Sequence, residues 1–303
     1  MKSNHSFSIL ISTKNRCEDL FFTIDKIKHL FSDRVTCVVF DDGSSDGTSE
    51  MITSTFPEVT LHHNKVSKGY IYCRNKMLNE TKADFAISLD DDAHFLTENP
   101  IEIIETYFND HPQVGLIATR IFWGKELMPY SKSDEEPQTV KSFVGCGHVW
   151  RMKAWHTIAN YPEWFEFYGE ENFASLQLFK KKWIVSYLPE LFVQHRVNLK
   201  ERASSKKNVA FRYRRSIRAD WYTYFLFFPL STIPRKLAYS IWIQCKSKVF
   251  KGNLNVVIPL LLAIFDLVIA IPKLFRHRIA LSSEEYLAYL KLNETKIYWK
   301  PEK

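Results

Sequence analysis

The sequence predicts an α/β fold with a mostly parallel sheet flanked by helices, followed by a helical region rich in basic and aromatic residues. Apolar runs and segments of helical spacing alternate from residue 7 to residue 89, which is the order of a parallel sheet with crossover helices. A hydrophobic content of 46% and a charged content of 25% are ordinary globular values, which excludes a largely disordered chain. A chain of 303 residues can form one large domain with an appendage.

Strands and helices follow one another in an order that the apolar spacing sets. In the first part, strands are expected at residues 7–12, 35–40, 59–62 and 83–89, and helices at residues 20–30, 48–56 and 68–79. Further along, we expect a helix at 100–110, a strand at 114–120, a mobile polar loop at 124–138, a strand giving way to a helix within 145–158, an amphipathic helix after 170 and a strand at 183–188.

The strand at residues 83–89 runs directly into three aspartates, Asp90, Asp91 and Asp92. Ligand sites of open α/β sheets lie beyond the carboxyl ends of such strands. Because side chains alternate along a strand, Asp90 and Asp92 should share one side while Asp91 projects away. Paired carboxylates suit Mg²⁺ or Mn²⁺, and no neighbouring residue in the sequence is basic enough to relieve their repulsion. The alternative is a solvated acidic turn.

Two further pairs of residues are candidates for nucleotide binding. Asp41 and Asp42 end the second strand, where a carboxylate can accept hydrogen bonds from a base or a ribose, although aspartates also form turns and helix caps. Lys68 and Arg74 could lie beside phosphates, although a basic residue on a helix is more often solvated.

Glu170 and Glu171 stand before an amphipathic helix, within an acidic and aromatic segment. Acids are stabilised at a helix N-terminus by the dipole, whether or not they do chemistry. In an apolar setting, either one could instead act as a general base with a raised pKa. His195 follows the last predicted strand, which makes it either a third metal ligand or an ordinary hydrogen-bonded histidine.

The charge of the chain is unevenly distributed. Residues 200–278 contain 16 Lys and Arg against three acids, a balance of +13, so the total of +7 leaves −6 for the rest. Residues 211–230 interleave arginine with aromatic residues, and 254–271 are nearly all apolar, broken by Pro259 and carrying Asp266. Apolar helices have no use in nucleic-acid binding, so we expect docking on an anionic membrane surface rather than nucleic acid, a membrane span or a core helix.

The compartment can also be predicted from the sequence. Five cysteines without CxxC spacing predict reduced thiols rather than disulfides or a zinc site. The first apolar run of the chain is too short for a signal peptide or a membrane span. We therefore expect a cytoplasmic protein, peripheral on the inner face of the membrane.

The motifs STKNR, DDGSSDGT, KGYIYCRN, SLDDDA, GCGHVWR, FYGEEN and QH occur in an order that resembles the inverting glycosyltransferases of family 2, over about residues 6 to 200. The resemblance implies a GT-A fold, with a nucleotide-sugar half at residues 1–97, an acceptor half at 98–200 and a separate helical region at 201–303. The glutamate that follows Glu170 stands where the family more often has aspartate, so either could be the base, and Glu171 is favoured. The roles that the resemblance implies are nucleotide contacts for Thr13, Asp41 and Asp42, ribose and diphosphate contacts for Asp90 and Asp91, and metal contacts for Asp90, Asp92 and His195.

The implied activity is a metal-dependent, inverting transfer from a nucleotide diphosphate sugar, with UDP favoured and Mn²⁺ or Mg²⁺ as cofactor. The acceptor would be a hydroxyl of a glycan or lipid-linked glycan in bacterial surface-polysaccharide synthesis. A sugar nucleotidyltransferase is the first alternative, but STKNR lacks the glycines of a phosphate loop. A catalytically inactive membrane scaffold is the second, and the acids present at every expected position count against it.

Overall fold

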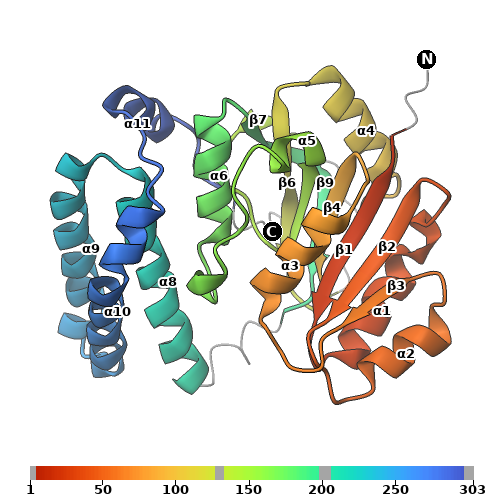
Figure 1. Ribbon diagram of the computed structural model, residues 1–303, viewed down its shortest axis with the longest axis horizontal. Coiled ribbons are helices and arrows are strands. Elements are labelled where there is room, and N and C mark those ends of the chain that lie inside the picture. The colour runs from red at the N-terminus through yellow and green to blue at the C-terminus, as the bar shows by residue number, and fades with distance from the viewer. Residues whose placement is uncertain (1–4, 127–132, 198–205, 297–303) are drawn as a thin grey trace.

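The computed structural model describes residues 5–126, 133–197 and 206–296, and within these it forms an α/β fold around one curled sheet (Figure 1). The strand order is β3-β2-β1-β4-β8-β6-β9-β5, and β7 also pairs with β9. The strands are β1 (Phe7–Thr13), β2 (Val35–Asp41), β3 (Thr60–His63), β4 (Phe85–Asp90), β5 (Ala93–Phe95), β6 (Val114–Trp123), β7 (Gln138–Thr139), β8 (Gly147–Arg151) and β9 (Ile184–His195).

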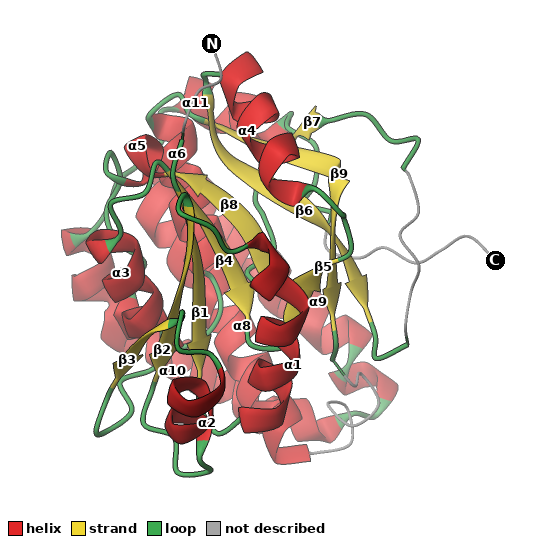
Figure 2. Ribbon diagram, turned by 90° about the vertical axis from the view of Figure 1, so that its right-hand side faces the viewer, coloured by secondary structure: helices red, strands yellow, loops and turns green. Residues whose placement is uncertain are grey.

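Helices cover both faces of the sheet and form a separate group beside it. They are α1 (Cys17–Ile27), α2 (Thr48–Thr55), α3 (Tyr70–Glu80), α4 (Pro100–Asp110), α5 (Met152–Trp155), α6 (Glu170–Lys180), α8 (Lys206–Phe227), α9 (Ile233–Ser247), α10 (Val257–Arg276) and α11 (Ser283–Leu290). Helices α1, α2 and α4 lie together on one face of the sheet (Figure 2). Helices α3, α5 and α6 belong to the core on the other face.

The first four strands of the sheet are parallel, as the sequence predicts. In this register Thr13 pairs with Asp41, and Ser12 pairs with Asp90. The loops that follow β1, β2 and β4 therefore start from the same edge of the sheet. This edge is where three of the sequence motifs meet.

The other half of the sheet is mixed rather than mostly parallel. Strand β8 runs antiparallel to both β4 and β6, and β5 and β7 run antiparallel to β9. Strand β9 is parallel to β6 and continues beyond the predicted strand at 183–188 as far as His195. The reversal at β5 matters for the site, since it pairs Ala93 with His195 and so places the histidine beside Asp92.

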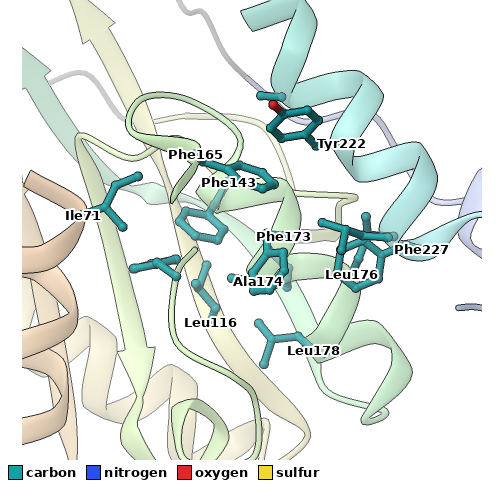
Figure 3. Close-up of a cluster of buried hydrophobic side chains, with 14 of the residues drawn as sticks. Ile71, Leu116, Phe143, Phe165, Phe173, Ala174, Leu176, Leu178, Tyr222 and Phe227 are labelled. Atoms are coloured by element: carbon teal, nitrogen blue, oxygen red, sulfur yellow. The ribbon is translucent and has the colours of Figure 1, made fainter. Parts of the chain in front are cut away.

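The core that covers the second face of the sheet continues from α6 into α8 (Figure 3). The rings of Phe173 and Phe227 are 5.5 Å apart, and those of Phe165 and Tyr222 are also 5.5 Å apart. The C-terminal helices are thus packed on the sheet region through α6, which lies between them and the sheet in Figure 1.

Helix α10 packs one side against α8 and leaves the other open. Asp266, in the middle of α10, accepts hydrogen bonds from Nε and Nη2 of Arg214 on α8, at 2.7 and 2.5 Å. Pro259 does not break the helix, because it lies in the first turn, where its missing N–H has no partner to lose. Residues 254–276 are long and apolar enough to cross a membrane, and 28% of their most apolar window is buried. A core helix of a soluble protein would be mostly buried.

Part of the predicted mobile loop at 124–138 lies outside the described residues. The strands on either side of this loop are β6, which ends at Trp123, and β7, which begins at Gln138. The strand and helix expected within 145–158 correspond to β8 and the short helix α5.

Candidate active site

A cavity of about 1020 Å³ opens at the carboxyl ends of β1 and β4. Asp41 and Lys68 do not line this cavity. The other residues selected from the sequence all do: Thr13, Asp42, Arg74, Asp90, Asp91, Asp92, Glu170, Glu171 and His195.

Asp90, Asp92 and His195 converge on one point of the cavity wall. Each offers a ligand atom within 4.8 Å of the other two. The His195 Nε2 atom is 3.0 Å from Oδ1 of Asp92 and 3.8 Å from Oδ2 of Asp90. Burial alone would raise the pKa of Asp92, but the hydrogen bond from His195 and the charge of Arg16 lower it to about 2. The sequence prediction that Asp90 and Asp92 share one side is consistent with this cluster.

These three residues fit a divalent cation. Two carboxylates and an imidazole nitrogen can be brought onto one ion, and hard oxygen ligands suit Mg²⁺ and Mn²⁺. The adjoining cavity leaves room for the water or phosphate oxygens that complete the shell of such ions. The imidazole of His195 is also in contact with the Trp123 ring, whose centre is 4.8 Å from its own, and with the Cys146 thiol.

Asp91 turns away from this cluster. Its Oδ2 accepts a hydrogen bond from the Thr13 hydroxyl at 2.8 Å, and its Oδ1 is 3.0 Å from Nε of Arg16. The side chain of Arg16 also donates to Asp92 at 2.7 Å. Burial raises the pKa of Asp91 to about 7, although Arg16 opposes the shift.

No residue next to the three aspartates in the sequence is basic, but the fold brings Arg16 and Arg74 against them from distant positions. Arg16, the last residue of STKNR, is not among the site residues predicted from the sequence. The signal was present, since STKNR follows β1 and the aspartates follow β4, and β1 and β4 are neighbours in the sheet.

Arg74 connects the aspartates to the two glutamates. It is buried on α3, and its Nη2 donates to Asp90 at 2.5 Å and to the carbonyl of Gly145 at 3.0 Å. Its Nη1 is 3.7 Å from Oε1 of Glu170. The neighbouring carboxylates raise the pKa of the guanidinium against the effect of burial, so the charge is permanent. A solvated role for this arginine is thereby excluded.

The two glutamates at the start of α6 have different surroundings. Glu170 is 2% exposed, and its Oε1 accepts a hydrogen bond from the Tyr70 hydroxyl at 2.7 Å, while no described residue bonds to its Oε2. Glu171 is half-buried in the cavity wall. Burial first, and the charge of Glu170 second, raise the pKa of Glu171 above its ordinary value. Gly145 leaves the space that this side chain occupies, since a Cβ there would lie 2.7 Å from its Oε1.

The two aspartates after β2 hold loops in place. Asp41 is completely buried and accepts hydrogen bonds from the backbone of Ser44 and the hydroxyl of Ser49. Asp42 accepts four hydrogen bonds, which come from the side chains of Asn64 and Ser67 and from the backbone N–H groups of residues 68 and 69. Both carboxylates are thus engaged within the protein, as the turn-forming alternative requires.

Lys68 precedes α3 and points to a residue in the first turn of that helix rather than to the cavity. Its Nζ donates to the Tyr72 hydroxyl at 3.3 Å and lies 4.6 Å from the centre of the Tyr72 ring. The lysine is exposed, which is the solvated alternative.

Comparison with known proteins gives one family and several solved structures. The model of glycosyl transferase family 2 matches residues 8–175, which is more than half of the chain. No curated protein matches the sequence.

The solved structures share the fold at low sequence identity. A mannosyltransferase from Pyrobaculum calidifontis, PcManGT, solved with GDP-Man and Mn²⁺, matches with a TM-score of 0.56 and 14% identity over 95% of this chain and 86% of that one. GalNAc-T7, solved with UDP, GalNAc and Mn²⁺, matches with a TM-score of 0.58 and 14% identity over 75% of this chain and 49% of that one. S. aureus TarS matches with a TM-score of 0.54 and 12% identity over 73% of this chain and 43% of that one. The chain therefore spans about half or less of the length of GalNAc-T7 and TarS.

Proposed function

The chain belongs to glycosyl transferase family 2, and from this premise we propose that it moves a sugar from a nucleotide diphosphate sugar to an acceptor hydroxyl with inversion at the anomeric carbon. One observation carries the proposal. The cluster of Asp90, Asp92 and His195 and the raised-pKa carboxyl of Glu171 line the same cavity, so donor and acceptor can meet between them.

Glu171 is the general base of this proposal. Its pKa is raised toward the range in which a base works efficiently near neutral pH, and it faces the cavity. Its carboxylate takes the proton of the acceptor hydroxyl while that oxygen forms a bond to the anomeric carbon. The bond between that carbon and the diphosphate oxygen breaks on the opposite face, and the diphosphate leaves with the electron pair.

Glu170 serves as the positioning partner of Glu171. Its carboxylate is fixed by Tyr70 and lies beside Arg74, and its charge helps to keep the pKa of Glu171 raised. This arrangement supports Glu171 as the base, because a buried and engaged carboxylate is badly placed to receive a proton from a substrate.

Asp90, Asp92 and His195 would hold Mn²⁺ or Mg²⁺. When bound, such an ion supplies positive charge that stabilises the diphosphate as it departs. Arg16 and Arg74 line the same cavity and form ion pairs with Asp92 and Asp90, which fixes the positions of these carboxylates.

The donor that we favour is a UDP-sugar. GalNAc-T7 with UDP and PcManGT with GDP-Man, both with Mn²⁺, support a nucleotide diphosphate donor and a divalent cation as a class. They leave the base to be identified by experiment.

The anomeric configuration of the product tests the mechanism. With an α-linked nucleotide sugar, inversion gives a β-linked product, which proton NMR distinguishes by its anomeric coupling. A product that keeps the α configuration would contradict the mechanism, while Glu171→Gln should yield almost no product.

We also propose that the open side of α10 docks on the anionic cytoplasmic leaflet of a membrane. Large apolar side chains along this side are exposed, among them Ile258, Leu261, Phe265 and Ile269. Exposed basic residues stand at both ends of the helix: Lys246 and Lys251 before it, and Lys273 and Arg276 within its last turn. Basic charge around an apolar face complements anionic lipid. On the opposite side of α10, Asp266 forms an ion pair with Arg214 of α8. Because this ion pair holds α10 against the protein, it favours docking on the membrane surface over a membrane-spanning helix.

Docking on this membrane fits an acceptor that is a lipid-linked glycan, as in bacterial surface-polysaccharide synthesis. Flotation with vesicles of 30% phosphatidylglycerol in phosphatidylcholine tests it. We expect the protein to bind these vesicles and not to bind vesicles of pure phosphatidylcholine. The double substitution of Phe265→Ser with Ile269→Ser should abolish the binding. A dimer that these substitutions dissociate, without vesicle binding, would instead show that the face joins two copies of the chain.

A further inference from the structure

A second cavity, of about 560 Å³, adjoins the first one at the proposed base. Four residues line both cavities: Trp123, Val144, Tyr168 and Glu171. A ligand in the second cavity can therefore present a hydroxyl to Glu171 while the first cavity holds the donor. The size is within the usual range for small-molecule sites.

Six aromatic side chains line the second cavity, and they come from elements far apart in the sequence. The segment before β8 provides Phe143, helix α8 provides Tyr224, the residue after α8 is Phe228, and α11 provides Tyr289. The rings of Tyr224 and Phe228 are stacked, with centres 5.2 Å apart. The apolar faces of a sugar ring can pack against aromatic side chains, whereas the hydroxyl groups of the sugar need polar partners.

The two cavities differ in the cations that line them. The wall of the first has six Lys and Arg side chains beside its carboxylates, among them Lys14, Arg16 and Arg74, and such cations can contact a diphosphate. The second is lined by the carboxylates of Glu171, Asp220 and Glu294 and by one lysine, Lys141, which is paired with Glu294. A phosphorylated group would meet uncompensated negative charge in the second cavity.

Asp220 and Asn172 are two polar side chains of this cavity that the described residues leave without partners. Asp220 on α8 has no hydrogen bond or ion pair among the described residues, and its side chain is exposed in the cavity wall. Asn172 on α6 directly follows the proposed base, and its side-chain amide likewise has no partner in the described part of the chain. Together they offer hydrogen-bond acceptors and donors from two helices.

We propose that the second cavity binds the sugar unit of the acceptor whose hydroxyl reacts, that this unit carries no phosphate, and that Asp220 and Asn172 hold its other hydroxyls. This rests on the proposed function, and it assigns to the C-terminal helices a part in choosing the acceptor. Helix α8 would thus join acceptor recognition to the membrane-docking region.

Binding of simple glycosides tests the proposal. Methyl glycosides of glucose, galactose and N-acetylglucosamine, and the 6-phosphates of the same sugars, are added to the full chain with Mn²⁺ and the nucleotide that binds. Saturation-transfer NMR measures each affinity. We expect at least one unphosphorylated glycoside to bind, and Asp220→Ala and Asn172→Ala each to weaken it by about tenfold or more, because a hydrogen bond to a charged or buried group is lost.

A matched control separates the loss of a contact in the second cavity from the loss of one negative charge anywhere on the protein. Asp110→Ala removes an exposed aspartate at the end of α4 that lines neither cavity, and it should leave glycoside binding unchanged. In steady-state assays Asp220→Ala should raise the acceptor KM by a similar factor while the donor KM stays near its wild-type value.

Three outcomes would overturn the inference. These are glycoside binding that is equal in wild type and Asp220→Ala, preferential binding of the 6-phosphates, and no binding of any glycoside to a nucleotide-loaded protein. In each of them nucleotide binding still occurs, so the proposed transferase function would stand. Failure of every nucleotide to bind would instead remove the proposed function on which the inference rests.

Discussion

Replacing Glu171 and Glu170 by glutamine, one at a time, separates the base from its positioning partner. Glu171→Gln keeps the size of the side chain at the start of α6 but removes the group that accepts the proton. A positioned general base contributes roughly 10²- to 10⁴-fold to the rate. We therefore expect kcat to fall by about that factor, which corresponds to roughly 3 to 5 kcal/mol in activation free energy.

Glu170→Gln should act on the pH dependence instead. The Tyr70 hydroxyl keeps an acceptor, because the amide has a carbonyl oxygen, and Arg74 keeps its partner Asp90. The charge beside Glu171 is lost, and that charge is the second cause of its raised pKa after burial. Since the base must be deprotonated, the acidic limb of the pH–rate profile should move to lower pH, by roughly one unit.

The assay is release of the nucleotide diphosphate at saturating donor and acceptor, from pH 5 to pH 9. We expect Glu170→Gln to keep more than a tenth of the wild-type maximal rate. A loss in Glu170→Gln as deep as in Glu171→Gln, with an unmoved profile, would refute the assignment. So would a Glu171→Gln protein that keeps more than a tenth of the rate.

Three other predictions follow from the same contacts. Arg74→Met leaves Glu170 and Asp90 without their cation, so urea denaturation at pH 7 should show a loss of about 3–5 kcal/mol in the free energy of unfolding, and a loss below about 1 kcal/mol would contradict this. Gly145→Ala places a Cβ 2.7 Å from Oε1 of Glu171, so kcat should fall about tenfold or more while the melting temperature changes little, because only the end of a flexible side chain must shift. The folded-state pKa of Glu171 lies above the unfolded value, so its ionisation costs stability as pH rises between the two, and thermal melts of Glu171→Gln should show a gain over wild type that is larger at pH 8 than at pH 5.

Much of the site could be predicted because it depends on local chain geometry. The period of two along β4 places Asp90 and Asp92 on one side, and the parallel order of the first strands brings their loops to one edge. His195 could be selected from its place after a predicted strand and from the order of the motifs, but its position beside Asp92 could not be derived, since it depends on the pairing of β5 with β9 across about 100 residues of sequence.

The contacts that the sequence could not give are those between helices and loops far apart in the chain. Arg16 reaches the aspartates because β1 adjoins β4, and Arg74 reaches Glu170 because α3 lies near the start of α6. A basic residue in a polar segment or on a helix looks solvated until its neighbours are known. For the same reason the sequence leaves Asp41 either as a nucleotide contact or as a turn residue, and in the structure it is buried and accepts hydrogen bonds from its own loop.

The second cavity could not be predicted from the sequence. Asp220 lies within a basic and aromatic segment that the sequence assigns to membrane docking as a whole. Only the packing of α8 on α6 turns one side of that helix toward Glu171.

The most direct test of the central claim is calorimetric binding of UDP, GDP, dTDP and their sugars to the full chain, with and without Mn²⁺ or Mg²⁺, for wild type and Asp92→Ala. The account predicts saturable binding of one nucleotide that requires the metal and is lost in Asp92→Ala, while circular dichroism shows both proteins folded. No binding of any nucleotide to the folded, metal-supplied wild-type chain would contradict it and would favour an inactive scaffold with this fold.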